Sequence, residues 1–357
     1  MAAIDIILSG DILPVRPLSN PPASADAIYQ RVRAADLAIG NFEMPLTERG
    51  VRVQKLLNIR APAALAADVP VLGFDIVTLA NNHAVDYGWD GLADTRAGLE
   101  AAGLDVIGVG ETRAIAAEPV FRDVGGLTIG VIAFSCLTPA GMSAAADRPG
   151  LAPIHIRTSY EVDPLYQVEE PGDPSVLKVR TEVAADDLAF AIDAVRAAKA
   201  ACDFLVVTIH WGFGSGEELA EYQLPLGRAL IDAGADVVHG HHPHAIHGIG
   251  FHAGKPIFFS SGTFIGQQVF LDASPAVHAL WAGMSPDGYL ASLSIEGGAI
   301  TAIRLLPTTL DTDRLPVRAE GAIADRIFER LGRLSGPLGA QVTRSGDELL
   351  VRPIACE

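Results

Sequence analysis

The chain has 357 residues, 49% of them hydrophobic, and its 43 acidic and 26 basic residues give a formal net charge of −17. This composition supports a substantial core and excludes intrinsic disorder, and the negative charge repels polyanions, so we expect no nucleic-acid partner. The three cysteines show no CxxC spacing, which excludes a thiolate zinc site and a disulfide framework.

Short strand-like runs alternate with helical runs through the first part of the chain. The run 4–8 reads IDIIL and leads into Ser-Gly-Asp, which predicts a strand that enters a turn. The further elements expected here are a helix over 24–35, a strand over 37–40, a helix from 62 to about 68, a strand over 75–79, a helix over 89–102, a strand over 105–107 and a hairpin over 119–134. This alternation indicates an α/β fold in which helices cover a sheet core.

The periodic pattern is lost between Pro139 and Thr181, where proline, glycine and charged residues are frequent. A long stretch without periodicity inside a compact chain is typical of a lid or a disordered insertion. We therefore predict an irregular insertion at about 138–182, with a possible role as a lid. Beyond it we expect a helix over 183–201, a strand over 204–210, a helix over 224–233, strands over 236–239 and 256–260, and a β pair over 289–305. No segment marks a linker, so we expect a single domain over 1–357.

No stretch of the sequence predicts a membrane partner. None approaches the roughly 20 uninterrupted apolar residues that a membrane helix needs. The N-terminal MAAIDIILSGD has no basic region, and its apolar run is too short for a secretion signal. We therefore expect a cytoplasmic protein.

Five polar clusters share one placement, because each begins where an apolar strand ends. In open α/β sheets, ligands bind beyond the carboxyl ends of the strands. If the strands are parallel neighbours, the clusters converge on one rim. The clusters are Gly10-Asp11, Asn41-Phe42-Glu43, Asn81-Asn82-His83, His210-Trp211-Gly212 and the GHHPH run over 240–244.

The side-chain types in these clusters indicate a divalent metal. Carboxylates, amide oxygens and neutral imidazoles form a mixed nitrogen and oxygen donor set without thiolate, which suits one or two ions of Mn, Zn, Fe or Co better than calcium. His242 and His244 flank a proline, and an extended backbone would direct both to one site. Asp11 or Glu43 could bridge two ions, and His83 could act as a general acid.

Taken alone, most of these clusters also have a plain structural explanation. A Gly-Asp pair after a strand is mostly turn chemistry, and Asn-Asn-His can begin a helix. A lone His210 is as often a hydrogen-bonded structural residue as a ligand. The three histidines over 241–244 are harder to explain in this way. The five clusters together therefore favour a metal site.

The order GD, NxE, NNHxxDxG, HWG and GHHPH resembles the bacterial capsule-synthesis family typified by CapA, the poly-γ-glutamate (PGA_cap) proteins. Further matches are GNFEMPLT at 40–47, GFDIVTLANNHAVDYG at 73–88 and DAGADVV at 232–238. The resemblance covers roughly Ile4 to Leu306. That family is similar to the calcineurin-like metallophosphoesterases, which implies an αββα sandwich of two packed mixed sheets flanked by helices.

The same resemblance implies a set of site residues. His83 would be the acid beside the metals, and Asp11 would serve both as a ligand and in catalysis. His241 precedes the matching histidine pair and is less favoured as a ligand. The implied metal ligands are Asp11, Glu43, Asn82, His210, His242 and His244.

Two departures from the related metallophosphoesterase and family patterns stand out. Asp11 is followed by Ile12-Leu13, whereas the metallophosphoesterase pattern has Asp-x-His, so one metal position could be weak or empty. An acidic residue usually follows HWG closely, but here Glu217 and Glu218 come only after FGSG. Either glutamate could keep the family role.

Several polar residues are candidates for binding the substrate. We predict contacts from Asn41, His241, Arg16, and Glu217 or Glu218. Arg16 follows the Asp11 loop and offers a planar fork to a carboxylate or phosphate. Arg60, Arg148 and Arg157 offer the same fork, although a solvated surface position is the more common one for each arginine. His155, Tyr160 and Tyr166 lie in the insertion and could reach over the site as part of a lid.

The leading hypothesis is a metal-dependent hydrolase that cleaves an amide (γ-glutamyl or peptide-like) or ester bond by attack of a metal-bound hydroxide. The family resemblance implies a γ-glutamyl amide, and the missing first-motif histidine argues against ordinary phosphatase chemistry. Two alternatives stay open: a metal-dependent peptide Cα epimerase and a non-catalytic factor in capsule polymer synthesis. The expected partner is a small-molecule or peptide-like substrate, and the sequence does not predict the oligomeric state.

Overall fold

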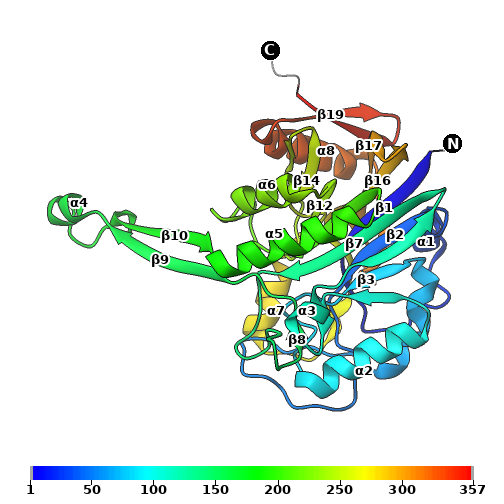
Figure 1. Cartoon of the computed structure of the whole chain (residues 1–357), viewed down its shortest axis with the longest axis horizontal. Helices are drawn as coiled ribbons and strands as arrows, with labels where there is room; N and C mark the ends of the chain where they lie inside the picture. Colours follow the sequence, from blue (N-terminus) through cyan, green and yellow to red (C-terminus); the bar gives the residue numbers. More distant parts are fainter. Residues whose placement is uncertain (1–2, 355–357) are drawn as a thin grey trace.

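Two β-sheets lie face to face at the centre of the structure, a computed structural model that describes residues 3–354 (Figure 1). The larger sheet contains, in spatial order, β19 (Ala340–Ser345), β20 (Glu348–Pro353), β17 (Ala299–Leu310), β16 (Asp287–Glu296), β1 (Ile4–Leu13), β2 (Leu37–Phe42), β3 (Ile76–Thr78) and β4 (Asp105–Ile107), with β15 (Thr263–Gly266) paired to β1 and β18 (Pro316–Arg318) paired to β17. The smaller sheet contains β13 (Ile249–His252), β14 (Lys255–Phe258), β12 (Val237–His241), β11 (Phe204–His210), β7 (Leu127–Ser135) and β6 (Val120–Val124).

Alternating side chains of the strands place apolar groups on both faces of each sheet. In β1, Ile6 and Leu8 join the core between the sheets, whereas Ile7 joins the core under the outer helices. In β11, Val206 faces inward and Val207 faces outward. Because neighbouring side chains of a strand point to opposite faces, a strand buried on both sides is apolar at nearly every position.

Helices cover the outer faces of the two sheets (Figure 1). On the larger sheet lie α1 (Ala23–Arg33), η1 (Ala63–Leu72) and α2 (Gly88–Ala101), and on the smaller sheet lie α5 (Ala185–Ala200) and α6 (Gln223–Ala233). The arrangement confirms the predicted αββα sandwich of two packed mixed sheets. The remaining elements are α8 (Gly321–Ser335), α7 (Pro275–Ala282), α3 (Arg113–Ala116), the short pair β5 (Val109–Gly110) and β8 (Gly150–Leu151), and the 3-10 turns η3 (Gln267–Phe270) and η4 (Gly336–Leu338).

One predicted helix differs in type from the observed element. The segment expected to form a helix from 62 to about 68 is a 3-10 helix that continues to Leu72. Pro70 lies inside it, and proline has no amide hydrogen for an α-helical bond to the fourth residue before it.

The segment 138–182, expected to be irregular, contains a regular hairpin. Strand β9 (Ile156–Val162) pairs antiparallel with β10 (Leu177–Val183), and α4 (Pro164–Glu169) and the 3-10 turn η2 (Pro174–Val176) form its tip. In Figure 1 this hairpin, which we call the arm (residues 156–183), projects away from the body of the molecule. Its strands do alternate apolar and polar residues, but prolines, glycines and charges around the tip hid this pattern. The proposed role as a lid stays a prediction.

The strands that precede the polar clusters are parallel neighbours. In the larger sheet, β2 lies between β1 and β3, with Asp11 level with Asn41. In the smaller sheet, β11 and β12 run parallel, with His210 level with His241. The carboxyl ends of both sets therefore open towards one region between the sheets. No helix in residues 3–354 is long and apolar enough to cross a membrane.

Candidate metal centre

The polar clusters meet near the carboxyl ends of the parallel strands of the two sheets. The turn expected after the strand 4–8 is not observed, because β1 continues through Asp11 to Leu13 and its pairing register shifts there. Asp11 lies in β1, Glu43 directly follows β2, and Asn82 follows β3, while His210 and His241 end β11 and β12. All of these side chains except Asn82 are fully buried. The structure thus gathers donors from five strands into one interior cluster.

The backbone around these residues shows why they reach the cluster. At Gly10 an added Cβ would lie 1.9 Å from the carbonyl oxygen of Gly262, so only glycine allows the close approach that places Asp11. Asn81 donates to the carbonyl oxygen of Phe42 at 2.9 Å and accepts from the amides of His83 and Ala84. These bonds shape the turn that follows β3 and hold Asn82 towards the cluster.

Asn41 holds the two carboxylates in place. Its Nδ2 donates to Asp11 Oδ1 at 2.7 Å and lies 3.3 Å from Glu43 Oε2, and its Oδ1 accepts from Asn81 at 3.0 Å. The amide of Asn41 is therefore engaged by protein groups on both sides. Its predicted contact with a substrate stays a prediction.

The histidines lie near the carboxylate oxygens that Asn41 does not contact. His244 Nδ1 lies 3.0 Å from Asp11 Oδ2, and His210 Nε2 lies 2.8 Å from Asn82 Oδ1 and 3.4 Å from Glu43 Oε1. The ring of His242 packs edge-on against His210 with centroids 4.7 Å apart. Each predicted ligand thus lies beside at least one other.

The backbone of the GHHPH run differs from the extended segment that we expected. His242 has a φ of 108° and His244 a φ of 50°, so both adopt conformations that side-chain-bearing residues rarely take. A tight turn around Pro243, and not an extended strand, brings both rings to the cluster. Such strain persists only where surrounding contacts enforce it, and it is frequent at functional sites.

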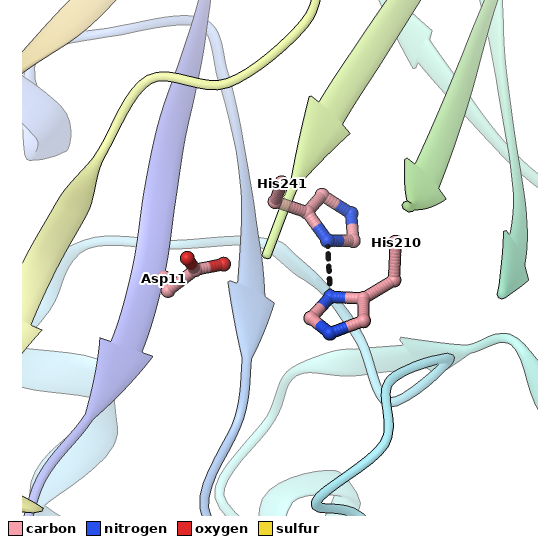
Figure 2. A group of neighbouring side chains, drawn as sticks. All are labelled: Asp11, His210 and His241. Carbon is pink, nitrogen blue, oxygen red and sulfur yellow. Dashed lines mark hydrogen bonds between the residues drawn. The ribbon is translucent and has the colours of Figure 1, made fainter. Parts of the chain in front are cut away.

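Two sets of donors are close enough to share an ion. Atoms of Glu43, His242 and His244 lie within 4.8 Å of one another, as do atoms of Asp11, His210 and His241. Figure 2 shows the second set, with His210 Nδ1 and His241 Nδ1 2.9 Å apart. His241, less favoured from the sequence, therefore lies among the donors, and its Nε2 lies 2.9 Å from the Thr208 hydroxyl.

The orphaned atoms of the cluster test whether a metal ion fits. Asp11 Oδ2, Glu43 Oε1 and His242 Nδ1 are buried and form no well-aligned hydrogen bond, although His244 Nδ1 lies 3.0 Å from Asp11 Oδ2 and His210 Nε2 lies 3.4 Å from Glu43 Oε1. An unsatisfied buried polar atom costs on the order of 1–3 kcal/mol, and more when charged. A divalent cation would satisfy lone pairs on carboxylate and imidazole atoms alike, and this mixed donor set suits Mn, Zn, Fe or Co. The residues therefore fit a divalent metal.

The pKa shifts of the clustered carboxylates and histidines are also consistent with a site for a positive charge. Burial lowers the pKa of His244, but Glu43 and Asp11 outweigh this effect and raise the pKa to about 9. Burial and the Asp11 carboxylate raise the pKa of Glu43 well above its ordinary value. For His210 and His242, burial lowers the pKa, so these rings are neutral at pH 7 and can bind metal.

A histidine–aspartate pair borders the cluster. His83 Nδ1 lies 2.7 Å from Asp86 Oδ2, and the buried Asp86 also accepts from Lys55 Nζ at 2.5 Å and from the amide of Ile59 at 2.7 Å. Lys55 Nζ donates further to the carbonyl oxygen of Asn82 at 2.7 Å. Sequence reasoning assigned no role to Asp86 or Lys55. The i, i+3 spacing in NNHxxD was a signal for Asp86, but none pointed to Lys55.

A basic pocket adjoins this pair. It has a volume of about 550 Å³, and its walls include Arg52, Lys55, Arg60 and Tyr87. The Arg60 guanidinium lies 4.5 Å over the Tyr87 ring, and Arg52 Nε donates to the Tyr87 hydroxyl at 3.2 Å. The three basic side chains share the pocket with one acidic side chain, Asp272, in a chain whose net charge is −17.

The remaining predicted substrate residues have other contacts. Arg16 pairs with Asp313 at 3.5 Å and stacks on the Phe270 ring, and Glu217 pairs with Arg330 and Arg333. Glu218 is exposed. In residues 3–354 we find no hydrogen bond or ion pair between these three residues and the donor cluster. Their predicted substrate contacts stay predictions.

Comparison with known proteins gives consistent matches. The family described as bacterial capsule synthesis protein PGA_cap matches residues 5–268, which include all five polar clusters. The chain is 30% identical over 251 residues to the PGA biosynthesis protein CapA of Bacillus subtilis (strain 168), covering 68% of this chain and 58% of that protein. It is 28% identical over 254 residues to the capsule biosynthesis protein CapA of Bacillus anthracis, covering 68% and 54%.

A third relative is matched over more of its length. The chain is 28% identical over 322 residues to a probable polyglutamine synthesis accessory protein of Mycobacterium tuberculosis (strain CDC 1551 / Oshkosh), covering 89% of this chain and 77% of that protein. By contrast, the chain spans little more than half the length of the two CapA proteins.

Proposed function

From the premise that this chain belongs to the bacterial capsule synthesis (PGA_cap) family, we propose that it is a metal-dependent hydrolase of amide or ester bonds in acidic, peptide-like substrates. One observation carries the proposal: three buried atoms without a well-aligned hydrogen bond, on Asp11, Glu43 and His242, lie in one cluster of metal-binding side-chain types beside the His83–Asp86 pair.

The buried cluster would hold the ion. Asp11, Glu43 and Asn82 supply oxygen atoms from the larger sheet, and the histidines of β11, β12 and the GHHPH turn supply nitrogen atoms from the smaller sheet. A divalent ion bound there would lower the pKa of a water molecule and polarise the bond to be cleaved. The donors sit on strand ends and Asn41 orients the two carboxylates, so the cluster needs little rearrangement to bind.

In this proposal His83 transfers a proton to the leaving group. The Asp86 carboxylate accepts from Nδ1–H, which sets the tautomer and leaves Nε2 to pass a proton to the leaving group. Lys55 donates to Asp86 and holds the carboxylate in position. Removing Asp86 would therefore free the ring and change its tautomer.

The basic pocket would select the substrate. Two named relatives are CapA proteins of capsule or PGA biosynthesis, and a γ-glutamyl chain carries a carboxylate on every residue. Arg52 and Arg60 can bind such carboxylates through paired N–H groups. Lys55 lines the same pocket and contacts the backbone of Asn82, which connects this charge to the donor cluster.

The test uses γ-glutamyl oligomers and protein purified without chelator. We expect glutamate release that is lost with a chelator and restored by Mn²⁺ or Zn²⁺. Arg60→Gln should raise KM for the oligomers, because it removes a guanidinium from the pocket, while the control Arg96→Gln, on α2 and outside the pocket, should leave KM unchanged. Running the reaction in D₂O separates the alternatives, since a Cα epimerase incorporates deuterium without cleavage. A metal-loaded preparation that does neither would refute enzymatic function for these substrates.

A further inference from the structure

A second group of reactive side chains lies where the segment 139–155 meets the start of α5. His155 Nε2 is 2.9 Å from Ser143 Oγ, and His155 Nδ1 is 2.6 Å from Asp187 Oδ2. Hydroxyl, imidazole and carboxylate thus follow one another at hydrogen-bond distance. This is the geometry by which a serine nucleophile, its base and an orienting acid are recognised, whatever their order in the sequence.

The surroundings of these side chains suit the three roles. Asp187 is buried, and it also accepts from the backbone amide of His155 at 2.8 Å and from Arg113 at 2.6 Å. The His155 side chain is 51% exposed, and each of its ring nitrogens has one hydrogen-bond partner. Ser143 and His155 line a pocket of about 740 Å³ whose walls include Pro153 and Phe190.

Two arginines of this pocket can stabilise negative charge. Arg113 stacks on the Phe190 ring at 4.1 Å, and its buried Nε has no hydrogen-bond partner. Arg148 Nε donates to the carbonyl oxygen of Ser143 at 3.2 Å and lines the same pocket. A developing oxyanion, or a carboxylate of a bound ester, would satisfy the orphaned Arg113 donor.

We propose that Ser143, His155 and Asp187 form a metal-independent esterase site for short acyl esters. Ser143 Oγ bonds to the ester carbonyl carbon while His155 Nε2 takes the hydroxyl proton. The bond to the alcohol then breaks, and His155 returns that proton to the departing alcohol. A water molecule then bonds to the acyl carbon while His155 Nε2 takes its proton. The bond to Ser143 Oγ breaks, His155 returns the proton to that oxygen, and the acid is released.

The test combines labelling and turnover in the presence of a chelator. A fluorophosphonate probe should label Ser143, located by mass spectrometry, and p-nitrophenyl acetate should be hydrolysed at an unchanged rate with EDTA. Ser143→Ala should lose the label and at least about 10³-fold of the turnover. The exposed control Ser175→Ala should keep both.

Folding is checked by thermal unfolding of each variant, and His155→Gln provides a second change that leaves the nucleophile in place. It should lower turnover comparably. Absence of a label on Ser143, equal turnover in Ser143→Ala and Ser175→Ala, or loss of turnover with EDTA would each overturn the proposal.

A different observation concerns the arm. Its two strands pair Tyr160 with Val179 and Val162 with Leu177, so these four apolar side chains share one face. They are 46–66% exposed. The opposite face carries charged partners, among them the pair Glu161 and Lys178. At the tip, Leu165 and Val168 are 78% and 77% exposed.

An isolated two-stranded hairpin is marginally stable in water, and an uncovered apolar face marks a site of association. The four side chains of the apolar face and the two at the tip together expose nearly the area of four whole side chains. This exposed apolar area is on the order of 700 Å². A stable interface needs roughly 800 Å² from each partner. We infer that the apolar face of the arm packs on the arm of a second copy of this chain around a two-fold axis.

Sedimentation of the full chain tests this inference. The wild type should be dimeric at micromolar concentration, and Val179→Asp should be monomeric because it places a charge in the apolar face. Ser159→Asp changes the polar face of the same strand pair and should stay dimeric. A monomeric wild type, or a dimer that Val179→Asp leaves unchanged, would overturn the inference. A monomeric wild type that binds phosphatidylcholine vesicles would instead assign the face to a lipid surface.

Discussion

Removal of one imidazole from the candidate metal centre is the most informative perturbation. His242 Nδ1 is buried without a hydrogen-bond partner, and its ring packs against His210, so no neighbouring side chain can replace it after substitution by alanine. We expect His242→Ala to weaken metal binding by at least about 100-fold. Loss of a residue that only hydrogen-bonds to a metal ligand already weakens binding by about 10- to 100-fold, and loss of the ligand itself should cost at least as much.

The expected effect on stability follows from linkage between binding and folding. At a free metal concentration of about 100 times the wild-type Kd, binding stabilises the wild type by about 2.7 kcal/mol. At the same concentration, a variant with a 100-fold higher Kd gains only about 0.4 kcal/mol. For a chain of this size these gains correspond to Tm increases of about 4 °C and under about 1 °C.

The assay is thermal unfolding with and without Mn²⁺ or Zn²⁺, together with metal analysis of the purified proteins. His252→Ala is the matched control, since His252 pairs with Asp232 and is not part of the donor cluster. It should keep the metal and the full Tm increase. Equal metal content and equal Tm increases in the two variants would remove His242 from the site and refute the reasoning.

Three further predictions follow from particular contacts. Asp86→Asn should lower kcat by about 10²- to 10⁴-fold without changing metal content, and an unchanged kcat would contradict the proton-transfer role. Gly240→Ala would place a Cβ 2.2 Å from Trp211 Nε1, so we expect a loss of roughly 3 kcal/mol in urea unfolding, whereas Gly332→Ala, in an open helical position, should be neutral or stabilising. Burial raises the pKa of the Cys136 thiol, so it should stay protonated and resist iodoacetamide at pH 8 until the protein is unfolded; rapid native labelling would contradict this.

The distribution of charge relates the proposed substrate pocket to the proposed metal-binding cluster. The whole chain is acidic, yet Arg52, Lys55 and Arg60 gather in one pocket next to His83. Since the excess negative charge repels anions elsewhere, this pocket can concentrate an acidic substrate beside the donor cluster. Activity on γ-glutamyl oligomers should consequently weaken as salt screens the pocket.

Most of the fold and the convergence of the five polar clusters on one region could be predicted from local sequence. Buried strands such as 4–8 and 204–210 are apolar at successive positions because both faces are covered, and this pattern does not depend on distant residues. Polar residues directly after such strands could be grouped in advance, because parallel strands end at a common edge.

Other features were decided only when distant segments packed together. The extended backbone expected around Pro243 is a turn with positive φ at His242 and His244, since contacts from both sheets enforce a conformation that no local preference favours. Lys55 contacts Asp86, which lies 31 positions away in the sequence, and no local sequence pattern predicts this contact. Local sequence thus determined which polar side chains lie near the ends of the strands. The packing of the two sheets determined which atoms face one another, because those distances depend on how segments far apart in the sequence come together.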